Sequence, residues 1–198
     1  MPFIVETIVS TQNATGDVHI APLGLIADGD GWIVAPFKPS RTLDNLRAYP
    51  YAVASHTNDV RVFAGCVTGR KSWPTRPASK IEGARLADCL SHWELEVTHV
   101  TEDDLRPRFH CRLAAVETHR PWQGFNRAQA AVLELAVLTT RLHMLPKEKI
   151  DAELKYLQIA IDKTAGSRES EAWGWLMEKV EAWRRGDPAA AAHQLALR

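Results

Sequence analysis

The stretch APFKPSRTLDNL, Ala35–Leu46, decides how this chain is organised, because an apolar strand pattern runs into it and a helix begins inside it. A plain surface turn needs Gly, Asn or Pro. This turn instead places Arg41 between two hydroxyl residues, Ser40 and Thr42, with Asn45 one helical turn further on. Such a set of hydrogen-bond donors is typical of an anion-binding site.

Two interpretations of this turn are open from the residues alone. Where a strand runs into a helix, unpaired backbone N–H groups and the positive end of the helix dipole favour an anion. Ser40 and Thr42 add hydroxyl donors, Arg41 can hold a phosphate with two parallel hydrogen bonds, and Asn45 can reach back with its amide. In the alternative, Ser40 or Thr42 only caps the helix while Arg41 is solvated.

The composition is that of an ordinary globular protein. The chain has 198 residues, enough to bury a core, and its 24 Lys and Arg balance 24 Asp and Glu. A net charge of zero argues against non-specific binding to nucleic acid or to a membrane surface. No apolar run approaches the ~20 residues that cross a bilayer, and the N-terminus does not have the pattern of a signal peptide. We therefore expect a cytoplasmic protein without nucleic-acid or membrane partners.

The cysteines and histidines do not predict a disulfide or a metal site. Cys66, Cys89 and Cys111 are odd in number and far apart, so reduced thiols are expected. The eight histidines include no HxxxH or HxH pair, and His92 and His99 fall on opposite faces of their strand. Metal ligation is therefore not expected.

Up to about Glu117 the hydrophobic period is that of β-strands. The strand patterns are Phe3–Thr11, Val18–Ala27, Trp32–Phe37, Tyr51–His56, Val60–Gly69, Trp93–Val100 and Arg108–His119. Roughly seven short strands predict a sandwich or a small barrel. The stretch Ala78–Ser91 is instead expected to form a short helix interrupted by Gly83.

From Asn126 the period becomes helical. Three apolar stripes follow one another: Ala128, Ala131, Val132, Leu135, Leu138 and Leu142; then Ile150, Leu154, Leu157 and Ile161; then Trp173, Leu176, Val180 and Trp183. Gly166 is expected to end the second helix and Gly186 the third. These helices predict a C-terminal appendage that packs on itself, on the barrel or on a partner subunit.

Two features in the strand region could form part of a ligand-binding site. Pro22 breaks the hydrogen-bond ladder of its strand and forces an edge, a bulge or a bend, and Gly24 follows on the same face. A flat ligand could lie against such a backbone; the alternative is a simple bulge at a barrel corner. Asn58, before Asp59, either points into the same cleft as Arg41 or only forms a hairpin turn.

A further motif precedes the first long helix. Asn126 is placed to cap that helix, and Arg127 lies in its first turn, where a cation opposes the helix dipole. A ligand anion, a carboxylate partner or a subunit contact would each favour Arg127 there. Simple exposure to solvent is the alternative.

These stretches together resemble a known fold family. HIAPLG (His19–Gly24), PFKPSRTLDNL (Pro36–Leu46) and VASHTNDVRVF (Val53–Phe63) resemble the FMN-binding split barrel of flavin reductases and pyridoxamine-phosphate oxidases. The chain is more similar still to the uncharacterised family of unknown function numbered 447, which joins such a barrel to a C-terminal helical piece. GFNRAQAAVLELAVLTTRL (Gly124–Leu142) looks like the helical signature of that family.

The resemblance implies a fold class that is mainly β with α, an FMN-binding split β-barrel followed by a C-terminal three-helix appendage. Residues 1–120 would form the flavin-binding domain and residues 121–198 the helical region. The FMN phosphate would lie on Ser40, Arg41, Thr42 and Asn45. The isoalloxazine ring would lie along Ala21, Pro22, Leu23 and Gly24, with Asn58 near its polar edge.

The same resemblance implies a homodimer, because split barrels hold their cofactor at a dimer interface. We expect an FMN flavoprotein of the flavin-reductase type, an oxidoreductase that passes a hydride or electrons from a donor to a small-molecule acceptor. No catalytic residue is identified, since the flavin supplies the redox chemistry. The alternatives are a module that holds FMN or another phosphorylated ligand without turnover, and a split barrel with an empty cleft that acts through protein contacts alone.

Overall fold

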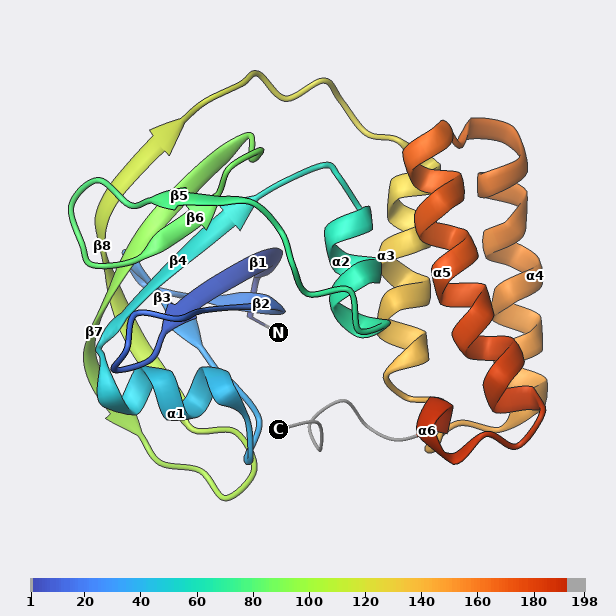
Figure 1. Ribbon diagram of the computed structural model, residues 1–198, viewed down its shortest axis with the longest axis horizontal. Helices are drawn as coiled ribbons and strands as arrows, with labels where there is room; N and C mark the ends of the chain where they lie inside the picture. The colour runs from blue at the N-terminus through green and yellow to red at the C-terminus, as the bar shows by residue number, and fades with distance from the viewer. Residues whose placement is uncertain (1, 192–198) are drawn as a thin grey trace. The chain divides into compact units, whose positions relative to one another are not determined.

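The computed structural model describes residues 2–191 and contains a β-barrel part and a helical part (Figure 1). Six strands close the barrel in the order β1-β2-β3-β8-β7-β4. Their bounds are β1 Ile4–Gln12, β2 Val18–Asp28, β3 Gly31–Val34, β4 Tyr51–His56, β7 Ser91–Thr101 and β8 Arg108–Thr118. All neighbouring strands pair antiparallel. The predicted small barrel is therefore confirmed.

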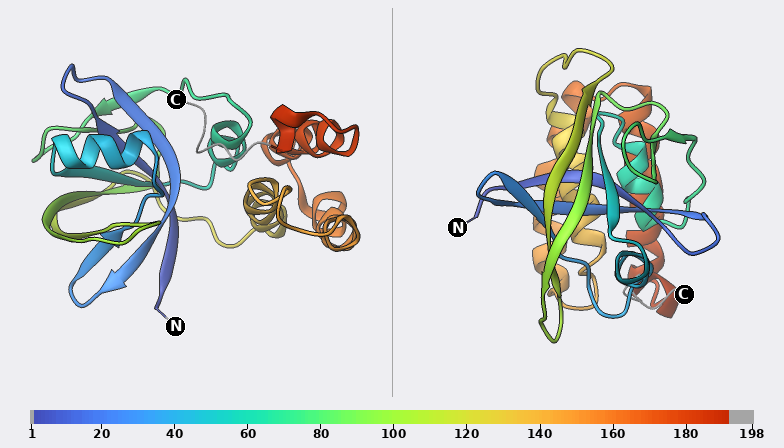
Figure 2. Two further views of the ribbon diagram at one scale, coloured as in Figure 1. Left: turned by 90° about the horizontal axis from the view of Figure 1, so that it is seen from below. Right: turned by 90° about the vertical axis from the view of Figure 1, so that its left-hand side faces the viewer.

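One end of the barrel is closed by α1 (Arg41–Ala48), which Figure 2 shows from that end in its left-hand view. Leu43 and Leu46 of α1 are buried against the barrel interior. The interior itself is filled by side chains from all six strands, with Val9, Leu25, Val34, Ala52, Ala54, Leu95, Phe109 and Cys111 at its centre. The helix that begins in the Ala35–Leu46 stretch is thus part of the barrel core.

The segment after Ser72 crosses the outside of the barrel and carries a separate two-stranded sheet, β5 (Thr75–Pro77) with β6 (Ala84–Leu86). The expected helix at Ala78–Ser91 is wrong. The carbonyl of Ala84 accepts a hydrogen bond from the Ser10 hydroxyl, and the Leu86 N–H donates to Ser55 Oγ at 3.0 Å. Because barrel side chains satisfy these backbone groups, the segment is stable in an extended form.

The expected strand at Val60–Gly69 is also wrong, since this stretch forms α2 (Arg61–Val67). Val60, Ala64 and Val67 recur at helical spacing and are buried in the core of the helical part. At the start of α2, the Asp59 carboxylate accepts a hydrogen bond from the Arg61 N–H at 3.2 Å. Packing on other helices overrides the strand preference of these β-branched residues.

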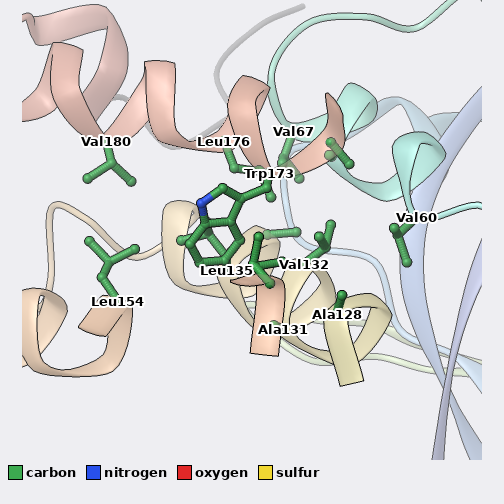
Figure 3. Packing of buried hydrophobic residues seen from close by; sticks show 14 of the residues in the cluster. Val60, Val67, Ala128, Ala131, Val132, Leu135, Leu154, Trp173, Leu176 and Val180 are labelled. Carbon is green, nitrogen blue, oxygen red and sulfur yellow. The ribbon is translucent and has the colours of Figure 1, made fainter. Parts of the chain in front are cut away.

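The helical part consists of α2 with α3 (Arg127–Thr139), α4 (Lys147–Thr164), α5 (Ser167–Arg184) and the short α6 (Pro188–Ala191). The three predicted C-terminal helices are confirmed. Figure 3 shows the Trp173 side chain of α5 among Leu135, Leu176 and other apolar residues of their shared core. The indole N–H of Trp173 donates to Gln158 at 3.1 Å, so its polar atom is satisfied.

The helix ends follow local rules with one exception. Asn126 caps α3, its side chain accepting hydrogen bonds from the N–H groups of Ala128 and Gln129 at 2.8 and 3.1 Å. Gly186, at φ +81°, follows α5 in the left-handed region that glycine favours. Gly166 does not end α4 in that way: its φ is −91°, and it serves as the N-terminal cap residue of α5.

Contacts divide the chain into two compact units. One contains the barrel, from the N-terminal strand to Thr57 together with Ser72–Trp122. The other contains Asn58–Lys71 and the described residues from Gln123 to Ala191. The assignment of flavin binding to residues 1–120 and of a helical region to residues 121–198 stays a prediction. Within residues 2–191, no helix is long and apolar enough to cross a membrane. Cys66, Cys89 and Cys111 are all buried, and none of them forms a disulfide.

Candidate functional site

The candidate site begins at the junction of β3 and α1. Ser40 has extended backbone, with φ at −160°, and its Oγ accepts a hydrogen bond from the Leu43 N–H at 3.3 Å. Ser40 is therefore the N-cap of α1, as the capping interpretation expects. A hydroxyl that accepts one hydrogen bond still has its own proton to donate, so capping does not exclude a role for Ser40 in binding an anion.

Arg41 is the first residue of α1, and its side chain is exposed. Within the described part of the chain its guanidinium has no hydrogen bond or ion pair. Hydrogen bonds from Thr15 and Asn13, and in smaller measure the charge of Arg41, hold the pKa of Asp17 below its usual value. Arg41 thus faces the region of the β1–β2 turn while its donors stay available to a ligand.

Thr42 and Asn45 are buried on the barrel side of α1. The Asn45 amide donates to Thr11 Oγ1 of β1 at 3.0 Å, and the Asn45 carbonyl accepts from the Tyr49 N–H at 2.7 Å. In this structure Asn45 therefore fastens α1 to β1. The bond to Thr11 uses one of the two N–H donors of the amide.

The turn before α1 is braced by residues that the sequence did not single out. The Arg106 guanidinium donates twice to the Ala35 carbonyl, at 2.7 and 3.0 Å, and lies 4.3 Å from the ring centre of Phe37. The Lys38 N–H donates to the Leu105 carbonyl at 2.9 Å. Burial, followed by the neighbouring charge of Arg108, lowers the pKa of Arg106. The β7–β8 loop is far away in sequence, so no local pattern could have indicated this brace.

The β2 stretch proposed to lie along a flat ligand is a regular strand. Ala21, Pro22, Leu23 and Gly24 pair in continuous register with Val9, Ile8, Thr7 and Glu6 of β1. A bulge at Pro22 is therefore wrong. On its other side β2 pairs with β3 only from Ile26 to Asp28, so this stretch lacks a second strand partner within residues 2–191. An edge of this kind is where a proline is tolerated.

The missing side chain of Gly24 has a packing reason within β1 and β2. A Cβ at Gly24 would lie 2.6 Å from Cγ2 of Ile4 and 3.4 Å from Oε1 of Glu6. Beside it, the Thr7 hydroxyl donates to the Leu23 carbonyl at 3.0 Å. The space left by the glycine is thus used by side chains of the neighbouring strand. A flat ligand on that face would have to displace Ile4.

Two of the predicted site segments, Ser40–Asn45 and Ala21–Gly24, lie in the barrel unit, whereas the other predicted residues belong to the helical unit. α1 packs on both β1 and β2, which puts the Ser40–Asn45 turn and the Ala21–Gly24 stretch in the barrel. Asn58, Asn126 and Arg127 belong to the helical unit. The Asn126 amide donates to the Thr164 carbonyl at 3.1 Å, and Arg127 is exposed. A role of Asn58 in the site at α1 stays a prediction.

A hollow in the barrel unit was not predicted from the sequence. It has a volume of about 360 Å³ and is lined by His56, Leu90, Ser91, Thr118, Arg120, Pro121 and Trp122. Burial, and then the charge of His92, lowers the pKa of His56 to about 4. Its Nε2 atom is buried without a hydrogen-bond partner in the described residues. His56 is therefore neutral at pH 7 and offers an unsatisfied ring nitrogen.

Comparison with known families identifies the relatives of this chain. A family model described as the N-terminal domain of a protein of unknown function, DUF447, matches residues 5–120. A second model, described as a protein of unknown function (DUF447), matches residues 126–178. The chain belongs to the DUF447 family. The resemblance to the family numbered 447 is thereby confirmed.

Solved structures show that the fold of this DUF447 chain is shared. It is similar to the FMN-bound DUF447 protein MM1853 from Methanosarcina mazei, at 20% identity and a TM-score of 0.78, over 90% of this chain and 95% of that chain. It is also similar to the 2-nitrobenzoate 2-nitroreductase NbaA of Pseudomonas fluorescens, at 16% identity and a TM-score of 0.50, over 60% of this chain and 66% of that chain. A search of curated protein sequences finds no match. The predicted fold class, a barrel followed by helices, is confirmed.

In this DUF447 protein the β3–α1 junction gathers the donors that an anion needs. The first-turn N–H groups of α1, the Ser40 hydroxyl and the Arg41 guanidinium lie at the same helix end. The carboxylate of Asp44 also lies in the first turn. None of these groups has the arrangement of an acid–base pair, so the junction is suited to binding rather than to proton transfer.

Proposed function

We propose that this protein is an FMN-binding flavoprotein whose cofactor phosphate is held at the β3–α1 junction. The observation that carries the proposal is the exposed Arg41 at the N-terminus of a helix capped by Ser40. Within residues 2–191 its guanidinium makes no hydrogen bond or ion pair. The family and fold shared with the FMN-bound protein MM1853 support the choice of FMN as the anion's carrier.

Each residue has a defined task in this proposal. Arg41 and the Ser40 hydroxyl donate to phosphate oxygens, and the first-turn N–H groups and dipole of α1 add to the attraction. Thr42 and Asn45 position α1, with Asn45 held by Thr11. Ala21, Pro22, Leu23 and Gly24 would support the ring system once the Ile4 side chain has moved from Gly24. Asn58 would lie near the polar edge of the ring. When bound, the flavin supplies hydride and electron transfer.

The wider setting is also a proposal. We infer a homodimer, because a flavin at a barrel edge is shielded from water when a second subunit covers it. A small-molecule substrate or an electron donor and acceptor would be the partners, in the cytoplasm. The second candidate is a module that holds FMN or another phosphorylated ligand at the β3–α1 junction without turnover.

The first experiment is the visible absorption spectrum of the purified protein, before and after FMN is added and the sample is desalted. A retained, protein-perturbed flavin spectrum would support the proposal. Complete loss of FMN on desalting, with no binding in a titration, would contradict it. Light scattering on the same sample measures the proposed dimer.

The phosphate assignment is tested with Arg41→Ala. We expect FMN binding to weaken by about 1.5–3 kcal/mol, the value of hydrogen bonds to a charged group, which is a rise in Kd of roughly 10- to 150-fold. The matched control is Arg47→Ala, because Arg47 lies in the last turn of the same helix and pairs with Glu102 at 2.9 Å. Fluorescence titration with FMN measures both. Equal affinities in the two variants would exclude the assignment.

Turnover separates the two candidate functions. An oxidoreductase should show loss of flavin absorbance with NADH or NADPH under anaerobic conditions, and its return when an acceptor is added. If the flavin binds but is reduced by neither, while dithionite reduces it, the binding module is favoured.

A further inference from the structure

A cluster of metal-ligating side chains lies outside the proposed flavin site, at one end of the β7–β8 pair. His92 of β7 lies directly opposite Glu117 of β8, and His119 follows two residues later. One potential ligand atom from each of the three residues lies within 4.8 Å of the others. His92 Nδ1 is 2.9 Å from His119 Nε2. His92 is buried, whereas His119 is exposed.

Glu94 fixes the orientation of the His92 ring. Its Nε2 lies 3.1 Å from Oε1 of Glu94, a fully buried carboxylate. Glu94 also accepts hydrogen bonds from the Ser79 N–H and hydroxyl and from the N–H groups of Lys80 and Ile81. With so many donors around it, the Glu94 carboxylate accepts a hydrogen bond from the N–H at His92 Nε2. The proton of the neutral ring is then on Nε2, and the lone pair of Nδ1 points toward His119. This is the carboxylate–histidine arrangement that orients metal-ligating histidines.

We propose that His92 Nδ1, His119 Nε2 and a Glu117 carboxylate oxygen form a site for a divalent transition metal of the zinc class. Two imidazole nitrogens and one carboxylate suit Zn²⁺, which binds nitrogen at about 2.0–2.1 Å in tetrahedral geometry. Nitrogen ligands of such an ion lie about 3.3 Å apart, so the two histidines would separate by only a few tenths of an ångström. His119 is exposed and can make that adjustment. The fourth position would hold water.

Two positive groups oppose the proposed cation. Arg85 and Arg76 of the β5–β6 hairpin act on His119, and Glu117 acts on it with the opposite sign. Arg85 is itself held by the carbonyls of Leu86 and Ala87, at 2.9 and 3.3 Å. The negative charges of Glu117 and Glu94 offset the two arginines. We therefore expect binding in the micromolar range rather than the tighter range of closed structural zinc sites.

The site would join three segments: β7 through His92, the end of β8 through Glu117 and His119, and the Ser79–Ile81 turn through Glu94. A bound metal would therefore stabilise the barrel at the place where β8 ends. This inference does not rest on flavin binding, so either proposal can fail without the other.

The test uses the full-length, untagged and metal-stripped protein, titrated with Co²⁺ and then with Zn²⁺ against a chromophoric chelator. We expect the visible absorption bands of a low-symmetry Co²⁺ site, displacement of Co²⁺ by Zn²⁺ at one equivalent, and a Zn²⁺ Kd of about 10 µM or lower. No Co²⁺ bands and no competition with the chelator would overturn the proposal. The two histidines would then share a hydrogen bond and nothing more.

The variants assign the ligands. His119→Ala removes an exposed side chain, so the fold should persist by circular dichroism while Zn²⁺ affinity falls at least tenfold. Glu117→Gln should weaken binding less, because it keeps one neutral oxygen ligand. The matched control is His143→Ala, an exposed histidine of the helical unit, which should bind as the unchanged protein does. Equal affinity in the His119→Ala and His143→Ala variants would overturn the assignment.

Discussion

At the scale of single residues, the buried carboxylate of Glu94 determines how the Ser79–Ile81 turn is held on the barrel. Its side chain is fully buried, and burial alone would raise its pKa. Hydrogen bonds from Ser79, His92 and Lys80 outweigh that effect and hold the pKa at about 2. The ionised carboxylate is the centre on which the Ser79–Ile81 turn folds. A buried charge is tolerated only when its hydrogen bonds are complete in this way.

Glu94→Gln tests this role. The amide NH₂ of glutamine cannot accept hydrogen bonds, so at least one of the N–H groups around position 94 would lose its partner. We expect a loss of about 1–3 kcal/mol in the free energy of unfolding, measured by urea denaturation. Glu82→Gln changes an exposed carboxylate of the same segment and should stay within about 0.5 kcal/mol of the parent. A similar small change in both variants would contradict the prediction.

The contacts of Asp59 predict how the free energy of unfolding depends on pH. Burial would raise the pKa of Asp59, but two hydrogen bonds from the Arg61 guanidinium, at 2.6 and 2.9 Å, and the charge of Arg168 lower it overall. A carboxyl group with a lowered pKa in the folded state stabilises the protein above its ordinary pKa, and this stabilisation disappears as the pH falls through the folded-state value.

We therefore expect Asp59→Asn to reduce the free energy of unfolding at pH 7, and the difference from the parent to shrink as the pH falls below about 4. Denaturation at several pH values measures it. Asp30→Asn, at an exposed turn, is the control and should show no such difference. A difference for Asp59→Asn that does not change with pH would contradict the assignment.

At the scale of elements, two glycines show how local geometry limits substitution. Gly31 opens β3, where a Cβ would collide with the backbone carbonyl of Cys111 in β8. Gly174 lies in the middle of α5, is exposed, and would place a Cβ in open space. The first glycine is required by strand pairing, whereas the second only weakens its helix.

Gly31→Ala and Gly174→Ala should therefore act in opposite directions. We expect Gly31→Ala to lower the free energy of unfolding by about 1–3 kcal/mol, because backbone cannot move aside as a side chain does. Gly174→Ala should raise it by about 0.5–1 kcal/mol, the helix advantage of alanine over glycine. Thermal and urea denaturation of both variants measure the effects. A destabilised Gly174→Ala protein would show that α5 has a neighbour at that position.

At the scale of the whole molecule, each unit has its own core, but the chain does not divide at one point. The helical unit takes Asn58–Lys71 from within the barrel sequence. Val60, Ala64 and Val67 of this segment are buried in the core that it shares with the C-terminal helices. Removing the C-terminal helices would therefore uncover an apolar face of α2.

A chain that ends at Trp122 should consequently aggregate or lose solubility, because exposed apolar patches favour association. In the same shortened chain, replacing Asn58–Lys71 by a glycine–serine linker of equal length should restore solubility. Size-exclusion chromatography of the two chains measures this. If the shortened chain with α2 is as monodisperse as the linker chain, α2 does not depend on the C-terminal helices.

The sequence by itself determined the elements that short-range patterns encode, namely strands, helices and helix ends. Alternating apolar residues predicted the barrel strands, three helical stripes predicted α3 to α5, and Asn126 and Gly186 marked helix ends correctly. The Ser40-Arg41-Thr42 turn was found at the start of a helix for the same reason, since capping and dipole effects act within one turn. Its role in binding FMN, and that of the other predicted site residues, stays a prediction.

Only the tertiary structure decided the features that depend on distant partners. Val60–Val67 has β-branched residues yet forms a helix, because its apolar face packs on α3 and α5. Ala84–Leu86 is extended because Ser10 and Ser55 satisfy its backbone. The Arg106 brace and the convergence of His92, Glu117 and His119 arise from strand pairing and loop contacts across long sequence separations. Such contacts leave no periodic trace in the sequence, because the energy that fixes them comes from the packed surface opposite each segment rather than from its neighbours along the chain.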